Sequence, residues 1–407
     1  MYLIDFVNYF ASKTVQNILK KEVMLPYGSM DIIMSNNRNV LGLIFSNMHD
    51  GTIPDLTKER TMGSVLFGGR YRLIDFPLSN MVNSGIDEVG VVTKSNYQSL
   101  LDHLGSGREW DLARKIGGLH LLPPFSHVQS GMYRGRLEAL YGVFNFINYS
   151  NADYVVLSDC DVVTSIDFSK VIDQHIATGA DITSVYAKDV INAEQAQHAT
   201  VFSLNDEGRI VDVLLAPHIS GAVNISLNMF VLSKDFLKNI VLEAASKSLY
   251  SFEQAILQGR TREYKIMGYE HTGYFSKITS METFYKANLD LLDLDNRNKL
   301  FPENKPVYTK VRDNPPVKFA IGASVKNSLI GDGCIIEGTV ENCVLFRGVK
   351  IGKGAVVKNA ILMQDTVIGS KCDINAVITD KNVNISDMRM LTGSPNYPLY
   401  IGKGAVI

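Results

Sequence analysis

The sequence predicts an α/β domain followed by a left-handed parallel β-helix. From residue 40 onward, short apolar runs suited to buried strands alternate with helical segments, which is the pattern of a parallel sheet with helices on both faces. After Pro315–Pro316 the pattern changes to aliphatic residues spaced six apart and often followed by glycine. That period indicates a hexapeptide-repeat solenoid. A chain of 407 residues is also too long for one compact core.

The α/β pattern begins with VLGLIF at residues 40–45, a short apolar run typical of a buried parallel strand. Pro77 to Ser84 is expected to form a helix that Gly85 ends, and Val89 to Thr93 the next strand. Strand and helix alternate again through LEALYGVFNFI, YVVLSDCDVV and FSKVIDQHIATGADITSVYA. Ligands of such sheets bind beyond the carboxyl ends of the strands, so the loops there are the first place to look for a site.

The six-residue period defines the second domain. It appears in the pairs Ile330 with Ile336, Ile351 with Val357, and Ile368 with Ile374. The expected division of the chain is an N-terminal extension at 1–38, the α/β domain at 39–300, a linker at 301–318 and the β-helix at 319–407. A small amphipathic helix is the alternative for the first residues, because Leu3, Phe6, Val7 and Phe10 follow helical spacing.

Composition excludes several classes of partner. The chain carries 40 Lys and Arg against 42 Asp and Glu, a net charge of −2, so nothing in its charge favours nucleic acid or an acidic membrane surface. No apolar run approaches the roughly 20 residues that span a bilayer, and the N-terminus lacks the features of a secretory signal. The cysteines Cys160, Cys334, Cys343 and Cys372 form no C-x-x-C pair, so buried thiols in a reducing cytoplasm are expected.

Four sequence blocks resemble, in the same order, those of bacterial ADP-glucose pyrophosphorylases, the glucose-1-phosphate adenylyltransferases of the glycogen pathway. They are FGGRYRLIDFPLSNMVNSGIDEVGVVT (67–93), MYRGRLEAL (132–140), YVVLSDCD (154–161) and YKANLDLL (285–292). The resemblance covers about residues 40 to 407. It implies a Rossmann-type domain like that of nucleotide-diphospho-sugar transferases, a left-handed β-helix and a tetrameric assembly.

The phosphate loop departs from this family. Catalytic subunits follow the first strand with a loop of the form GGxGxRL, whereas this chain has Asn47, Met48, His49, Asp50, Gly51, Thr52 and Ile53. Glycines that let the backbone approach phosphate are replaced by Asn47, Met48 and Asp50, and the basic residue by Thr52. A carboxylate at Asp50 would also repel a triphosphate. Phosphate binding is therefore expected to fail in this loop.

Three other contacts that the resemblance implies are also missing. Met62–Gly63 stands where the family has a Lys-Pro pair, and Leu215–Ala216, before Pro217, stands where it has a Glu-Lys pair. Lys277 replaces the family's second metal-binding aspartate. Loss of one charge-stabilising group typically costs about 10²–10³ in rate.

One family carboxylate survives, Asp161, which remains a vestigial catalytic candidate. Asp161 and the nearby Asp159 are the candidate metal ligands, the alternative being that both cap the following turn. No cofactor is predicted for this chain alone, and the resemblance implies Mg²⁺ for the assembled enzyme.

Several basic residues remain near the altered loop. Arg60, Arg70, Arg72 and Arg134, with Lys371 from the tail, are the candidates for binding a phosphate or an anionic effector, since the arginine fork suits phosphate. The resemblance places Arg60 and Arg72 around the effector pocket near the β-helix. The alternative is that these are solvated surface side chains.

The sequence therefore predicts a regulatory, catalytically deficient subunit, similar to the non-catalytic D-type subunit of the glycogen pathway. It would pair with a catalytic homologue in a heterotetramer and bind an anionic phosphorylated effector. One alternative is an active nucleotidyltransferase with a rewired phosphate loop, and a ligand-binding sensor without a catalytic partner stays open. A β-helix acyltransferase is disfavoured, because no histidine follows His271 to serve as its base.

Overall fold

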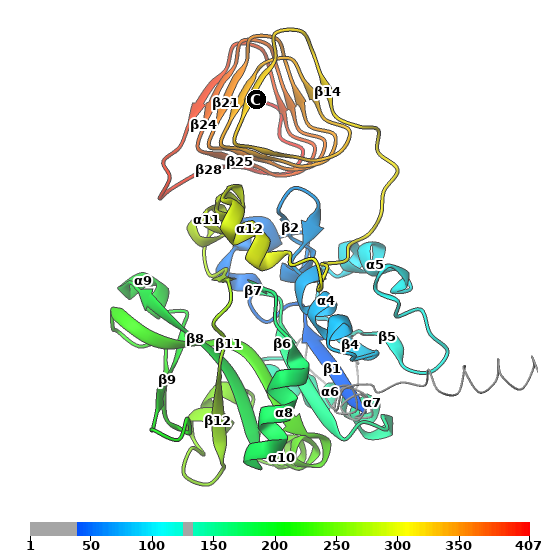
Figure 1. Ribbon diagram of the computed structural model, residues 1–407, viewed down its shortest axis with the longest axis vertical. Coiled ribbons are helices and arrows are strands. Elements are labelled where there is room, and N and C mark those ends of the chain that lie inside the picture. The colour runs from blue at the N-terminus through cyan, green and yellow to red at the C-terminus, as the bar shows by residue number, and fades with distance from the viewer. Residues whose placement is uncertain (1–38, 125–132) are drawn as a thin grey trace, which may run out of the picture. The chain divides into compact units, whose positions relative to one another are not determined.

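The computed structural model describes residues 39–124 and 133–407. The expected N-terminal extension, and the amphipathic helix considered within it, lie outside the described residues. The described part consists of a mixed α/β domain, blue to yellow in Figure 1, and a β-helix, yellow to red. The expected architecture is thus confirmed.

A nine-stranded sheet forms the centre of the α/β domain, in the order β10-β9-β11-β6-β1-β4-β5, with β8 pairing with β11 and β12. Its strands are β1 (Val40–Phe45), β4 (Glu88–Val92), β5 (Gly118–Leu122), β6 (Tyr154–Asp159), β8 (Ile182–Ile191), β9 (Thr200–Leu204), β10 (Ile210–Leu215), β11 (Gly221–Ser233) and β12 (Ile266–Glu270). The prediction of a parallel sheet is correct for β6, β1, β4 and β5. It is wrong for β11, which runs antiparallel to β6 and to β8, because an apolar run indicates burial but not strand direction.

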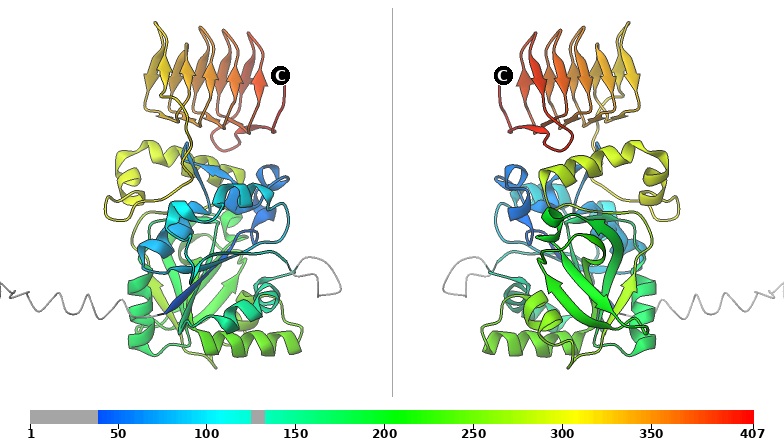
Figure 2. Two further views of the ribbon diagram at one scale, coloured as in Figure 1. Left: turned by 90° about the vertical axis from the view of Figure 1, so that its right-hand side faces the viewer. Right: turned by 90° about the vertical axis from the view of Figure 1, so that its left-hand side faces the viewer.

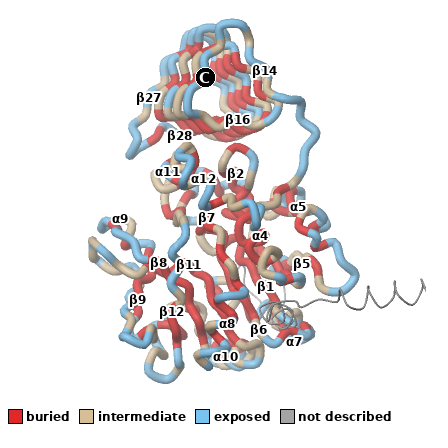
Figure 3. Tube along the Cα trace, in the orientation of Figure 1, coloured by how far each residue is buried: buried red, intermediate tan, exposed pale blue. Residues whose placement is uncertain are grey.

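Helices cover both faces of this sheet, among them α4, α6, α7, α8 and α10. The helices of the domain are α3 (Pro54–Thr57), α4 (Asp75–Asn83), α5 (Gln98–Leu104), α6 (Arg136–Gly142), α7 (Phe144–Tyr149), α8 (Phe168–Thr178), α9 (Ala193–Ala196), α10 (Lys234–Ser246), α11 (Met281–Leu289) and α12 (Leu294–Leu300). Side chains alternate along β1: Leu43 and Phe45 join a core with α6, α7 and α10, whereas Ile44 joins a core with α4 and α8. Figure 3 shows these strands as the buried centre of the domain. The helix expected at Pro77–Ser84 is α4, which begins two residues earlier.

Two small sheets complete the domain. β2 (Leu66–Phe67) pairs with β3 (Tyr71–Arg72), and β7 (Val162–Thr164) pairs with β13 (Phe275–Lys277). The pairing of β7 with β13 brings residue 277 beside the end of β6, although 118 positions separate residues 159 and 277 in the chain.

The β-helix consists of three parallel five-stranded sheets, whose coils are stacked in Figure 2. One contains β14 (Lys318–Phe319), β17 (Ile335–Ile336), β20 (Lys350–Ile351), β23 (Val367–Ile368) and β26 (Asn384–Ile385). The next contains β15 (Ser324–Lys326), β18 (Thr339–Glu341), β21 (Val356–Lys358), β24 (Asp373–Asn375) and β27 (Met390–Thr392). The third contains β16 (Leu329–Ile330), β19 (Val344–Leu345), β22 (Ile361–Leu362), β25 (Val377–Thr379) and β28 (Leu399–Ile401). Of the aliphatics that predicted the repeat, all are buried except the half-buried Ile330.

The third β-helix sheet packs against the α/β domain. Val344, Ile361 and Ile378 belong to the same hydrophobic core as residues of α4 and α11. Figure 1 shows β25 and β28 on the side of the β-helix that faces α11, α12 and β2. The two domains therefore share buried apolar surface, which fixes the position of side chains at their junction.

Two further expectations concern the membrane and the thiols. Among the residues that the structure describes, no helix is both long and apolar enough to cross a membrane. All four cysteines are free thiols and buried, as predicted.

Candidate functional site

The main cluster of polar side chains lies where β1 and β6 end. These neighbouring strands are parallel and in register, with Phe45 opposite Asp159, so the loops that follow them emerge at the same edge of the sheet. The first loop carries residues 46–53 and the second carries Asp161. This is the edge at which sheets of this type bind ligands.

The altered phosphate loop is held in place by its own side chains. Asn47 donates from Nδ2 to Asp50 Oδ2 (2.7 Å) and accepts from the Lys94 amide (3.0 Å) at Oδ1. The amide of Met62 donates to Asp50 Oδ1 (2.7 Å). Both oxygens of the Asp50 carboxylate are thus already hydrogen-bonded, one to Asn47 of the loop and one to the Met62 amide at the start of the short helix Met62–Ser64.

The Asp50 carboxyl lies in a largely buried place. Burial raises its pKa to about 6, and the hydrogen bonds from Asn47 and Met62 only partly oppose that rise. An ionised Asp50 therefore adds negative charge in the loop where a nucleotide phosphate would need positive charge or free N–H groups.

His49 lies between the two aspartates at the end of β6. Its Nε2 is 2.7 Å from Asp159 Oδ2 and 3.6 Å from Asp161 Oδ2. Asn228 donates from Nδ2 to Asp161 Oδ2 (2.9 Å). Burial lowers the pKa of His49, but the carboxylates of Asp161 and Asp159 more than offset this and raise it above its ordinary value. The two carboxylates therefore stabilise the charged form of the imidazole.

Two further cations lie at these carboxylates. Arg136 from α6 binds Asp159 with both arms, at 2.7 and 2.8 Å, and also contacts Glu253 at 3.0 Å. Lys277 from β13 donates to the Ser226 carbonyl (2.9 Å). Burial lowers the pKa of Lys277, and the nearby Asp161 and Asp159 oppose that effect.

These residues do not fit the Mg²⁺ site that the family resemblance implies. Mg²⁺ requires near-octahedral oxygen coordination and keeps several waters. Here His49 brings a nitrogen donor, Arg136 covers one edge of Asp159, and Lys277 stands in place of a second carboxylate. No catalytic step through Mg²⁺ follows from this geometry.

The segment that would hold a sugar phosphate has no charged side chain. Leu215 ends β10, and Ala216 follows in the left-handed region at φ 46°. Neither residue can form an ion pair with a phosphate, so the structure offers no substitute for the Glu-Lys pair at this point.

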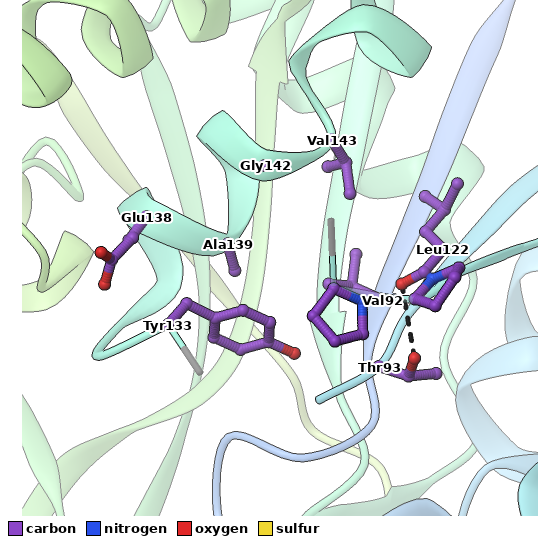
Figure 4. Close-up of a pocket in the computed structure, with 10 residues that line it drawn as sticks. Val92, Thr93, Leu122, Tyr133, Glu138, Ala139, Gly142 and Val143 are labelled. Carbon is purple, nitrogen blue, oxygen red and sulfur yellow. Dashed lines mark hydrogen bonds between the residues drawn. The ribbon is translucent and has the colours of Figure 1, made fainter. Parts of the chain in front are cut away.

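A recess remains beside α6, at the carboxyl ends of β4 and β5. It is lined by Val92, Thr93, Leu122, Pro123, Pro124, Tyr133, Glu138, Ala139, Gly142 and Val143. Figure 4 shows the Tyr133 ring extending from beside Ala139 toward Thr93 and Leu122. Arg134 lies near this recess: it pairs with Glu138 (3.2 Å) and stacks on the Tyr250 ring (3.5 Å to the centroid).

A second polar cluster lies at the junction with the β-helix. Arg60 binds Asp380 with both arms, at 2.9 and 2.6 Å, and both side chains are buried. Because Asp380 already neutralises Arg60, this arginine mainly links the two domains.

Beside that ion pair is a cavity lined by basic side chains. Its lining consists of Leu66, Gly69, Arg70, Arg72, His103, Lys310, Arg312, Phe346, Arg347 and Gln364, with no acidic residue among these described ones. Arg72 is buried and donates to the carbonyl and hydroxyl of Ser99 (2.6 and 2.9 Å). Burial lowers its pKa to about 10. The Nε of Arg347 is buried and has no hydrogen-bond partner in the described part of the chain.

Lys381 belongs to the same electrostatic neighbourhood. Burial, followed by repulsion from Arg72 and Arg60, lowers its pKa to about 7. By contrast, Lys371 lies between β23 and β24, on a corner that does not border the sheet packed against the α/β domain. The structure therefore brings Arg70 and Arg72 together, with Arg60 adjacent, but not Arg134 or Lys371.

Sequence reasoning missed several residues of these clusters. Arg312, Arg347 and Lys381 were not singled out, although each is a basic residue in or after the linker. Two features of the sequence could have indicated these residues. They are the excess of basic side chains around residue 312 and the hexapeptide register, which assigns each residue to a strand or a corner of the β-helix. His49 and Arg136 were missed as partners of Asp159, because the 110 and 23 positions that separate them from it leave no local pattern.

Comparison with known proteins supports the assignment of both domains. Residues 53–293 match the nucleotidyl transferase family, and residues 315–394 match the GlmU-like C-terminal hexapeptide family. The chain is 35% identical over 371 residues to the glycogen biosynthesis protein GlgD of Bacillus subtilis, covering 91% of this chain and 97% of that protein. It is 36% identical over 328 residues to the glucose-1-phosphate adenylyltransferase of Geobacillus stearothermophilus, covering 79% and 84%. A GlgD from the latter organism is 37% identical over 322 residues, covering 79% and 83%.

Proposed function

This chain belongs to the glucose-1-phosphate adenylyltransferase family, and from that premise we propose that it is a catalytically deficient, regulatory subunit. It acts in glycogen biosynthesis in the cytoplasm, where it associates with a catalytic homologue and modulates the formation of ADP-glucose. The names of its relatives, which include both GlgD and the adenylyltransferase, support this pathway.

The observation that carries the proposal is that side chains of the phosphate loop already form hydrogen bonds where a nucleotide phosphate would bind. Asp50 occupies the Met62 amide with its carboxylate at 2.7 Å, and Asn47 fixes the same carboxylate from the other side. A triphosphate entering this loop would have to break both hydrogen bonds and approach a negative charge. Loss of one charge-stabilising contact costs about 10²–10³ in rate, so several losses together account for a deficient catalyst.

A regulatory role is supported by the basic cavity at the domain junction. Arg70, Arg72 and Arg347 line it without a carboxylate among the described lining residues. An anionic phosphorylated effector would add negative charge among these arginines and supply a hydrogen-bond acceptor for Arg347 Nε, which is 3.9 Å from Asp332 Oδ2 and makes no hydrogen bond to it. Because the cavity lies where the two domains share a core, effector binding can bias their packing and hence the partner's response. Couplings of this kind are typically about 1–3 kcal/mol.

The direct test is an assay of the purified chain with and without a catalytic homologue. Alone, the chain should form no ADP-glucose from ATP and glucose 1-phosphate. Mixed with the catalytic subunit, it should form a hetero-oligomer and raise turnover or effector sensitivity. Normal turnover by the isolated chain would contradict the proposal. A chain that never associates with the catalytic subunit would instead favour a sensor without a catalytic partner.

An active transferase with a rewired phosphate loop is the second candidate. It is favoured by the survival of Asp161 at the strand end and by the open recess beside Tyr133. Asp161→Asn separates the two candidates in the assembled enzyme. The change should abolish activity if this chain performs the chemistry, and should leave turnover largely unchanged if it only regulates.

A further inference from the structure

We propose that the interdomain linker is a movable wall of the basic cavity at the domain junction, and that a bound phosphate group draws Arg312 of this linker onto itself. The linker opens to admit the phosphate group and then closes over it. This inference rests on the effector binding proposed above and states how the same cavity is regulated.

The cavity is too small for a phosphate group while all of its walls stay in place. Its volume is about 20 Å³, which is room for roughly one water molecule. A phosphate group carries a shell of oxygens around its phosphorus and needs more space than that. At least one wall therefore has to move when a phosphorylated ligand binds.

The walls that the two domains contribute are rigid. The turn between β2 and β3 packs directly on the β-helix, since a Cβ added to Gly331 would lie only 3.1 Å from the carbonyl oxygen of Gly69. Arg72 of β3 is buried and hydrogen-bonded to Ser99. Arg347 belongs to a stacked coil of the β-helix, and its side chain is 9% exposed. Displacing any of these groups would disrupt close packing at the junction.

The wall that the linker contributes is held by few contacts. Residues 306–317 form neither helix nor strand, and Figure 1 shows this part of the chain passing α5 on its way to β14. Within the described chain, no backbone hydrogen bond joins residues 309–313 to either domain. Lys310 supplies a side-chain tie by donating from Nζ to the carbonyl of Asp102 in α5, whereas residues 311–313 are exposed. A stretch with so few hydrogen bonds and so little burial opens at low cost.

The charges around the cavity favour closure of the linker on an anion. Five arginine and lysine side chains line it, two of them from the linker, and its described lining residues include no aspartate or glutamate. Arg312 has no ion-pair partner among the described residues. Burial lowers the pKa of Arg347, and repulsion from Arg70 and Arg312 adds to this effect. An anion placed among these side chains relieves the repulsion.

An unsatisfied donor indicates where the anion is bound. The Nε of Arg347 is buried, and no described residue accepts a hydrogen bond from it. A buried donor without an acceptor is costly, so an oxygen of the anion is expected at this atom. The planar guanidinium of Arg312 can then bind other oxygens of the same phosphate group. The bound anion would thus connect the β-helix to the linker, and Arg72 would connect it to the α/β domain.

The test is amide hydrogen exchange of the full chain, measured by mass spectrometry with and without inorganic phosphate. Phosphate is the charged group that phosphorylated effectors share, and titration calorimetry first gives its Kd. At about ten times this Kd, exchange of the amides at 309–313 should slow by about 10-fold, because only the phosphate-free form opens. Sodium chloride at the same ionic strength should give no such protection.

Arg312→Gln should weaken phosphate binding by about 10-fold or more, since a hydrogen bond to a charged group is lost, and should remove the protection of residues 309–313. Lys318→Gln is the matched control. Lys318 is exposed at the end of the linker and does not line the cavity, so phosphate binding and protection should both stay as in the wild type.

Two results would overturn the inference. Phosphate binding without slower exchange at 309–313 would show that the linker does not close, and an unchanged affinity in Arg312→Gln would show that Arg312 is not a ligand. In either case Arg72→Ala would still weaken phosphate binding, and the effector site of the proposed function would stand. No phosphate binding by the wild type would overturn both the inference and the effector site.

Discussion

Arg60 and Asp380 form a buried two-armed ion pair, at 2.9 and 2.6 Å, across 320 positions of the chain. It joins the segment after α3 to the corner that follows β25 in the β-helix. The side chains of Arg60 and Asp380 are only 5% and 3% exposed, so neither can turn to water when its partner is lost.

Arg60→Ala is therefore expected to destabilise the chain by about 3–5 kcal/mol, because it leaves the Asp380 charge buried without a partner. Chemical denaturation followed by fluorescence would measure the loss.

Lys403→Ala is the matched control. Lys403 pairs with Glu59 across the same junction (2.8 Å), but both side chains are largely exposed, so this change should cost far less stability than Arg60→Ala. Equal effects of the two changes would show that the buried pair does not link the domains.

Asp50→Asn should stabilise the chain at high pH but not at low pH. The folded pKa of Asp50 is raised from 3.8 to about 6, so the folded state holds its proton more tightly than the unfolded state. Stability from this group is present below about pH 4 and is lost as the pH rises to about 6. Asparagine does not ionise, so the variant avoids this loss of stability. The difference between the folded and unfolded pKa of Asp50 corresponds to at most about 3 kcal/mol.

The measurement is the difference in unfolding free energy between wild type and Asp50→Asn at pH 4 and at pH 8. The gain should appear only at pH 8. Asp55→Asn, which removes an exposed carboxylate from α3, serves as the control. A constant difference across this range would contradict the burial of an ionisable Asp50.

The fold could largely be predicted from the sequence because its signals are local. The apolar run at 40–45 gives β1 with the expected bounds, and the six-residue period gives the β-helix. Strand direction was not predictable for β11, whose pairing with β6 and β8 depends on contacts far along the chain.

The candidate site was less predictable, since its contacts join distant loops. The replacement of the loop glycines by Asn47 and Asp50 can be read from the sequence. The hydrogen bonds that these two side chains form cannot. Lys371 and Lys381 are only ten positions apart, but they lie on different corners of the β-helix. The spacing of aliphatics defines the coils, whereas the corner that faces the α/β domain depends on how the domains dock.

Arg72→Ala should weaken binding of a phosphorylated intermediate by at least about 10-fold, because a hydrogen bond to a charged group contributes about 1.5–3 kcal/mol. Titration calorimetry with a panel of phosphorylated glycolytic intermediates would identify the tightest ligand and then compare the variants. Lys381→Ala should weaken the same ligand, and Lys371→Ala should not. An unchanged affinity in Arg72→Ala would place the effector elsewhere.

The affinity for that anion should also fall as the pH rises through about 7. Burial and the neighbouring Arg72 and Arg60 lower the pKa of Lys381 to about 7, so its ammonium is partly deprotonated in the free protein at neutral pH. An anion favours the charged form, so binding takes up a proton and is stronger at pH 6 than at pH 8. Calorimetry in two buffers of different ionisation enthalpy would measure the uptake directly. Lys381→Arg should keep the affinity for the anion but lose the pH dependence that comes from this residue, because arginine stays protonated throughout this range. If the pH dependence of binding is unchanged in this variant, another group takes up the proton.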